Sequence, residues 1–136
     1  MSEEKNKYPI IRDVAEQELD RFFEMMEIDL DLETKGPEER GIFEGEKERL
    51  IKAIMLGRLV INEEGLAEYT TTSGDLLTFQ EPDGAANMAM DRAKSGESFS
   101  KMYKAIAAIT ETSTATFSKM KRRDLKVCEA IFLFYQ

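Results

Sequence analysis

The side chains of this sequence that could do chemistry are carboxylates and one thiol. The chain has 27 Asp and Glu residues, no histidine and a single cysteine. Without histidine, Ser-His-Asp and Cys-His arrangements and histidine-containing zinc sites are excluded. Cys128 falls on an apolar helical face, where we expect it in the core, and one thiol cannot build a thiolate metal site. Carboxylates are too numerous for any to be assigned as general acid or base, so the sequence favours a protein that is not an enzyme.

One spacing of carboxylates resembles the start of a calcium-binding loop. Asp29, Asp31 and Glu33 alternate as the first ligands of such a loop do. The sixth position, which needs glycine, is Thr34, and the twelfth, which needs a carboxylate, is Arg40. We interpret the run as acidic linker and expect no metal site. The chain also lacks GxGxxG and Walker phosphate-binding motifs, so no cofactor is predicted.

The charge of the chain is unevenly distributed. The net charge is −8, made up of −7 in residues 1–56, −5 in residues 57–100 and +4 in residues 101–136. The negative total argues against nucleic acid as the main ligand, because phosphate binding requires clustered Lys and Arg. Opposite charges at the two ends can steer one copy toward another, so we expect a homo-oligomer. The alternative is that both charged faces are simply solvated.

Length and composition predict a single domain over residues 1–136, with 1–9 as a frayed N-terminal arm. No apolar run approaches the roughly 20 residues needed to span a bilayer, so we expect no membrane partner. The start MSEEKNKYPII lacks the basic-then-apolar order of a signal peptide. Together with the single cysteine, this favours a reducing cytoplasm.

Hydrophobic periodicity predicts an α+β fold that is mainly α-helical. We expect about five helices and a small antiparallel β-hairpin or three-stranded element around residues 58–80. The first helix should cover 10–27, and the second should end near Leu56 after an acidic linker at 28–41. Pro37 could occupy the first turn of that second helix.

A proline marks the change from strand to helix in the second half. Pro82 should end the third strand, and Asp83 can cap a helix over 84–94. Two more helices are predicted at 98–110 and 125–135, and Asp124 could cap the latter. The residues expected in the core of this half are Leu76, Phe79, Phe99, Ile106 and Ile109.

Two apolar features suggest a surface that binds another protein. Met88 and Met90 belong to a methionine-rich helix, and flexible thioethers suit surfaces that repack against different partners. The chain ends in AIFLFYQ, which includes Phe132 and Tyr135 and has no polar face. That last helix is either enclosed in the core or offered to another chain. These four residues are the candidate protein-binding site.

The order of elements in residues 46–136 resembles the tail assembly chaperones of long-tailed bacteriophages. The similar segments, in order, are IMLGRLVI, NEEG, LTFQEPDGAANMAMDRA, KMYKAIAAIT, a Thr/Ser joint and FSKMKRRDLKVCEAIFLFYQ. The family often has a Leu-Asp or Met-Asp pair in the helix after the proline, here Met90 and Asp91, and an acidic residue before its last helix, here Asp124.

The resemblance implies a function in the cytoplasm of the infected host. Members bind the tape measure protein, keep it soluble, are displaced by tail tube protein and are absent from the mature virion. Many are also made in a longer, frameshifted form. The alternative is a head-to-tail connector or tail-completion protein that stays in the virion. A third hypothesis is a small regulatory binding protein encoded by a prophage.

Overall fold

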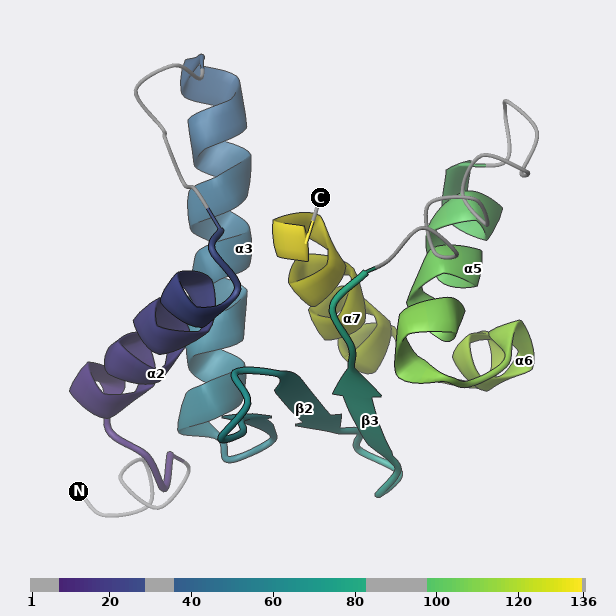
Figure 1. The fold of residues 1–136 in the computed structure, drawn as a ribbon, viewed down its shortest axis with the longest axis horizontal. Coiled ribbons are helices and arrows are strands. Elements are labelled where there is room, and N and C mark those ends of the chain that lie inside the picture. The colour runs from purple at the N-terminus through teal and green to yellow at the C-terminus, as the bar shows by residue number, and fades with distance from the viewer. Residues whose placement is uncertain (1–7, 29–35, 83–97, 136) are drawn as a thin grey trace. The chain divides into compact units, whose positions relative to one another are not determined.

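The structure is a computed structural model that describes residues 8–28, 36–82 and 98–135 (Figure 1). The described residues form five helices and a three-stranded antiparallel sheet, so the predicted α+β, mainly helical fold is confirmed. The chain divides into two compact units, Met1–Ala67 and Glu68–Gln136. The single domain expected over residues 1–136 stays a prediction. None of the described helices has the length and apolar character needed to cross a membrane.

The first unit is built on α2 (Arg12–Met25) and α3 (Pro37–Met55), which pack against each other and against β1 (Leu59–Ile61). Each helix buries one apolar face, as the helical spacing predicts. The buried residues are Ala15, Leu19, Phe22 and Phe23 on α2 and Leu50, Ile51, Ala53 and Ile54 on α3. The guanidinium of Arg21 joins α2 to the end of β1 by donating to the carbonyl oxygens of Ile61 at 2.6 Å and Asn62 at 3.1 Å.

The acidic linker predicted over 28–41 is shorter than expected, because α3 begins at Pro37. Proline at the first helical position loses no intrahelical hydrogen bond, and Glu38 and Glu39 are favourable in the positive end of the helix dipole. Residues 37–41 are therefore helical. At the other end, Gly57 has a φ of +79°, the left-handed conformation expected of a residue that follows a helix.

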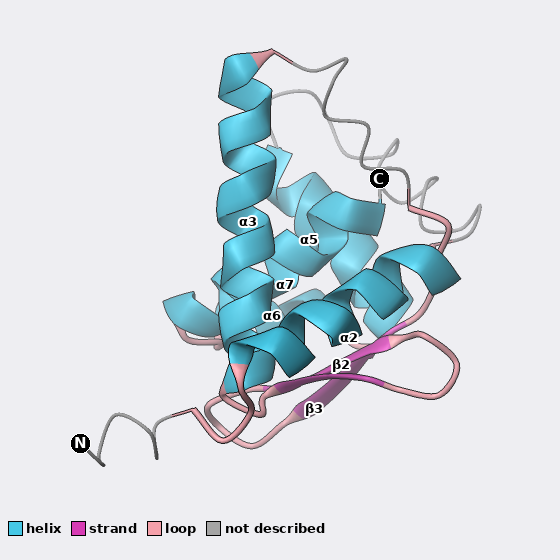
Figure 2. Ribbon diagram, turned by 90° about the vertical axis from the view of Figure 1, so that its left-hand side faces the viewer, coloured by secondary structure: helices cyan, strands magenta, loops and turns pink. Residues whose placement is uncertain are grey.

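The sheet has the order β1-β2-β3, with β2 at Ala67–Thr70 and β3 at Leu76–Phe79 (Figure 2). The turn after β1 is held by the Asn62 side chain, whose oxygen accepts the N–H groups of Glu64 and Leu66, both at 2.9 Å. Gly65 completes the turn with a φ of +84°.

The prediction that Leu76 is a core residue is wrong, since its side chain is 60% exposed. Side chains alternate between the two faces of a strand, so Leu76 and Phe79, three residues apart, point to opposite faces. Leu77 and Phe79 are the pair that share the buried face. The prediction for Phe79 is confirmed.

The second unit contains β2 from Glu68 onward, β3 and, among its described residues, three helices: α5 (Ser98–Thr110), α6 (Thr114–Ser118) and α7 (Arg122–Tyr135). The bounds of α5 match the prediction, and Ile106 and Ile109 are buried as expected. The backbone N–H of Gln80 donates to the carbonyl oxygen of Ile109 at 2.8 Å, which fixes the end of β3 to the end of α5. The helix predicted over 84–94 and the side chain of Phe99 lie outside the described residues.

Candidate functional site

The structure describes two of the four predicted protein-binding residues, Phe132 and Tyr135. Met88 and Met90 lie outside the described residues. Phe132 is only 2% exposed, as part of a run in which Ala130, Ile131 and Phe134 are also buried. Tyr135 is partly buried, and its hydroxyl donates to the carbonyl oxygen of Phe79 at 2.9 Å. Phe132 is therefore not on the surface of this structure, and the binding role of all four residues stays a prediction.

A buried carboxylate, Asp124, accepts hydrogen bonds through both of its oxygens. Its Oδ1 accepts the Tyr69 hydroxyl at 2.6 Å and the Thr72 backbone N–H at 3.1 Å. Its Oδ2 accepts the Thr72 hydroxyl at 2.7 Å and the same N–H at 3.2 Å. We call these three residues the Asp124 clamp. The short O–H···O distances are typical of charge-assisted hydrogen bonds.

The elements on either side explain how the Asp124 clamp is positioned. Tyr69 falls on the buried face of β2, and Thr72 lies in the turn that leads to β3. The helix α7 starts at Arg122, three residues before the predicted Leu125. The prediction that Asp124 caps this helix is therefore wrong, because Asp124 lies inside the first turn and its oxygens bind the β2–β3 turn instead. A carboxylate in the first turn is still favoured by the helix dipole.

The Asp124 clamp has the properties of a structural link. Burying a carboxylate costs several kcal/mol unless hydrogen bonds replace its water, and here both oxygens have protein donors. No buried side-chain N or O atom of the described residues lacks a hydrogen-bond partner. The same carboxylate is fully buried, with 0% of its surface exposed. Its oxygens are thus engaged inside the unit and not directed at a substrate.

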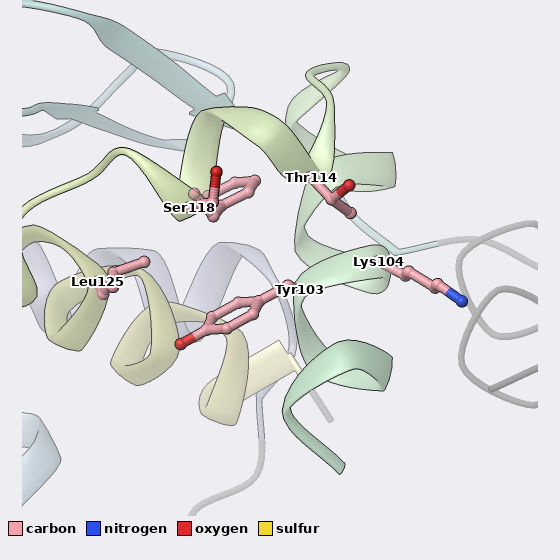
Figure 3. A pocket seen from close by; sticks show the side chains of 6 residues that line it. Tyr103, Lys104, Thr114, Ser118 and Leu125 are labelled. Carbon is pink, nitrogen blue, oxygen red and sulfur yellow. The ribbon is translucent and has the colours of Figure 1, made fainter. Parts of the chain in front are cut away.

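A half-open pocket of about 330 Å³ lies between α5, α6 and α7 (Figure 3). We call it the aromatic pocket, and it is lined by Tyr103, Lys104, Thr114, Phe117, Ser118 and Leu125. The rings of Tyr103 and Phe117 are stacked, with centroids 6.1 Å apart and planes within 3°. Figure 3 shows Thr114 and Ser118 on α6 across from Tyr103 and Leu125, with the Lys104 ammonium extending away from the Tyr103 ring.

One polar group of the aromatic pocket, the Tyr103 hydroxyl, is engaged by a carboxylate. The Tyr103 hydroxyl donates to Glu129 Oε2 at 3.0 Å. Burial and this contact with a carboxylate raise the pKa of Tyr103, so the phenol stays protonated at neutral pH. A volume of about 330 Å³ lies at the small end of the range for ligand pockets, roughly 300–1,000 Å³. The pocket therefore suits an apolar side chain or a small ligand.

Cys128 is fully buried, which confirms its predicted place in the core. Its thiol lies 3.9 Å from the sulfur of Met120. Burial, with the nearby carboxylates of Asp124 and Glu129, raises the pKa of Cys128 to about 12. The thiol is therefore neutral at physiological pH and is a poor nucleophile.

Within the described ranges, no group of three or more His, Cys, Asp or Glu side chains could hold a metal ion. The calcium-loop-like residues Asp29, Asp31 and Glu33 lie outside those ranges. Sequence reasoning missed the partners of Asp124, which are 52 and 55 residues away in the chain. The run TTTSGD, which includes Thr72, indicates a turn but gives no sign of the carboxylate that its hydroxyl and N–H bind.

Replacing Asp124 by Asn should destabilise the protein by about 2–3 kcal/mol. The new amide NH₂ group is a donor, and it would face the donors of Tyr69 and Thr72 that a carboxylate oxygen now accepts. Tyr69→Phe is the matched control. It removes one donor while the Thr72 bonds remain, so it should cost less, about 1–2 kcal/mol. Urea unfolding followed by circular dichroism measures both. Equal effects below about 0.5 kcal/mol would show that the clamp contributes little.

The Cys128 thiol should react with a disulfide reagent at pH 8 more than about 1,000-fold slower in the folded than in the urea-unfolded protein. Because the folded pKa lies above the ordinary value of 9.0, the folded state holds this proton more tightly. The stability that the thiol contributes is thus complete below pH 9 and is lost as pH rises toward 12. Unfolding curves of wild type and Cys128→Ala between pH 8 and pH 10 measure the difference. Fast labelling of the folded protein would contradict the buried placement.

Comparison with protein-family models, curated proteins and solved structures gave no match to this chain.

Proposed function

We propose that this protein is a non-enzymatic chaperone for the assembly of long bacteriophage tails. In this function it binds the tape measure protein in the cytoplasm of the infected host and keeps that protein soluble. Tail tube protein then displaces it, and it is absent from the mature virion. The proposal rests on the resemblance of residues 46–136 to tail assembly chaperones.

The observation that carries the proposal is the order of elements from the end of α3 to α7. The segment IMLGRLVI covers the end of α3, Gly57 and β1, and NEEG forms the turn that Asn62 holds. The segment KMYKAIAAIT lies in α5, and the Thr/Ser joint contains α6 before the closing α7. These elements occur in the order on which the resemblance depends.

The chemistry of the second unit supports a binding function. The oxygens of Asp124 are engaged by protein donors, and the Cys128 thiol is neutral and buried. The aromatic pocket combines two stacked rings with hydroxyl groups and one lysine, which is a surface suited to another side chain. Groups of this kind hold a partner by shape and apolar contact.

Replacing Met88 and Met90 together by Glu should lower the recovery of soluble tape measure protein when the two proteins are co-expressed. The reason is that charge on an apolar capture surface opposes burial of the partner. Two controls bracket the result. Leu76→Glu changes a side chain that is 60% exposed and should leave both recovery and melting temperature near wild type. Ile106→Glu places a charge where the side chain is 0% exposed and should unfold the protein.

The outcomes separate capture from folding. Loss of recovery with a wild-type melting temperature supports capture by the methionines. If the double methionine variant is unfolded like Ile106→Glu, the two methionines are core residues. If it is folded and recovers as much soluble tape measure protein as the wild type, the capture surface lies elsewhere. Mass spectrometry of purified particles separates the chaperone from a connector, since a connector would be present at fixed copy number. Presence in the particle would overturn the proposed function.

A further inference from the structure

The first turns of α3 form an exposed helix with one protruding apolar side chain. We call residues 37–45 the α3 tip, and none of its side chains is buried. Figures 1 and 2 show these turns extending beyond the part of α3 that packs against α2. Ile42 is 55% exposed. A Cβ atom added at Gly41 or Gly45 would meet nothing within 4 Å, so the space beside these two glycines is open.

The α3 tip is also acidic, since it holds Glu38, Glu39 and Glu44 and a single base, Arg40. Glu38 and Glu39 precede Ile42 by four and three residues, which places them on the same face of the helix. The tip therefore presents a branched apolar side chain flanked by carboxylates. Residues 1–56 as a whole carry a net charge of −7.

The aromatic pocket has the complementary properties. Its rings and Leu125 give it an apolar lining, and about 330 Å³ is enough for a branched aliphatic side chain. Lys104 lines it directly, and Arg122 lies three residues before Leu125 on the same face of α7. Glu129 is also close, but it accepts the Tyr103 hydroxyl. Residues 101–136 carry a net charge of +4, opposite to that of residues 1–56.

We propose that copies of this chain associate head to tail, with Ile42 of one copy inserted into the aromatic pocket of the next. The carboxylates of the α3 tip then face the cations around the pocket. The two surfaces are different, so the contact is heterologous, and each added copy leaves one tip and one pocket open for another. Association of this kind does not depend on the proposed function in tail assembly.

The test uses two variants, each of which blocks one surface. Ile42→Asp removes the apolar side chain of the tip, and Thr114→Trp fills the pocket from its exposed rim. In sedimentation at low salt, the average mass of the wild type should rise with concentration, and each variant alone should associate at least about tenfold more weakly. Added salt should weaken wild-type association, because the charges are exposed. Val14→Asp is the matched control, since Val14 is 43% exposed on α2 and belongs to neither surface.

Mixing the two variants gives the sharpest result. Ile42→Asp keeps an intact pocket and Thr114→Trp keeps an intact tip, so an equal mixture should form a one-to-one complex and nothing larger. Melting temperatures verify that each variant is folded, and Ser118→Trp on the same rim replaces Thr114→Trp if that variant does not fold. A wild type that stays monomeric at high concentration would overturn the proposal. So would variants that associate like the wild type, or a mixture that forms no complex.

Discussion

The buried carboxylate of Asp124 is the constraint on which the second unit depends. A charge removed from water must be met by donors, and the clamp supplies them from residues more than 50 positions earlier in the chain. The first turn of α7 is thereby fixed to the turn after β2. The remaining helices of the unit are held by burial of apolar side chains, and that interaction has no preferred direction. The hydrogen bonds of Asp124 do have a direction, so they select one position of α7 relative to the β2–β3 turn.

The position of α7 in turn shapes the aromatic pocket. Leu125 follows Asp124 directly and lines the pocket, while Glu129, one turn later, accepts the Tyr103 hydroxyl of α5. Three helices thus enclose a pocket that is lined mainly by apolar side chains, with the basic residues Lys104 and Arg122 beside it. The proposed chaperone function and the proposed head-to-tail association both need such a surface, because each requires another polypeptide to be recognised by apolar contact and charge.

The elements whose signals are local could be predicted from the sequence. The range of α5 follows from its amphipathic spacing, and the turn at Asn62 and Gly65 follows from its turn residues. Leu76 was misassigned because the strand register depends on which face meets the core. The first turn of α7 was misassigned because Asp124 has the type of a capping residue, and nothing nearby in the chain shows that its donors lie in β2. The pocket could not be predicted at all, since it forms only where three helices meet.

We infer that the Asp124 clamp holds the β2–β3 turn and α7 together as one cooperative unit. Hydrogen exchange at the Thr72 amide tests this inference, because that N–H donates to the carboxylate of Asp124. This amide should exchange as slowly as the central amides of α7, through the same opening of the unit. Exchange at the rate of an exposed turn, with α7 still protected, would contradict it.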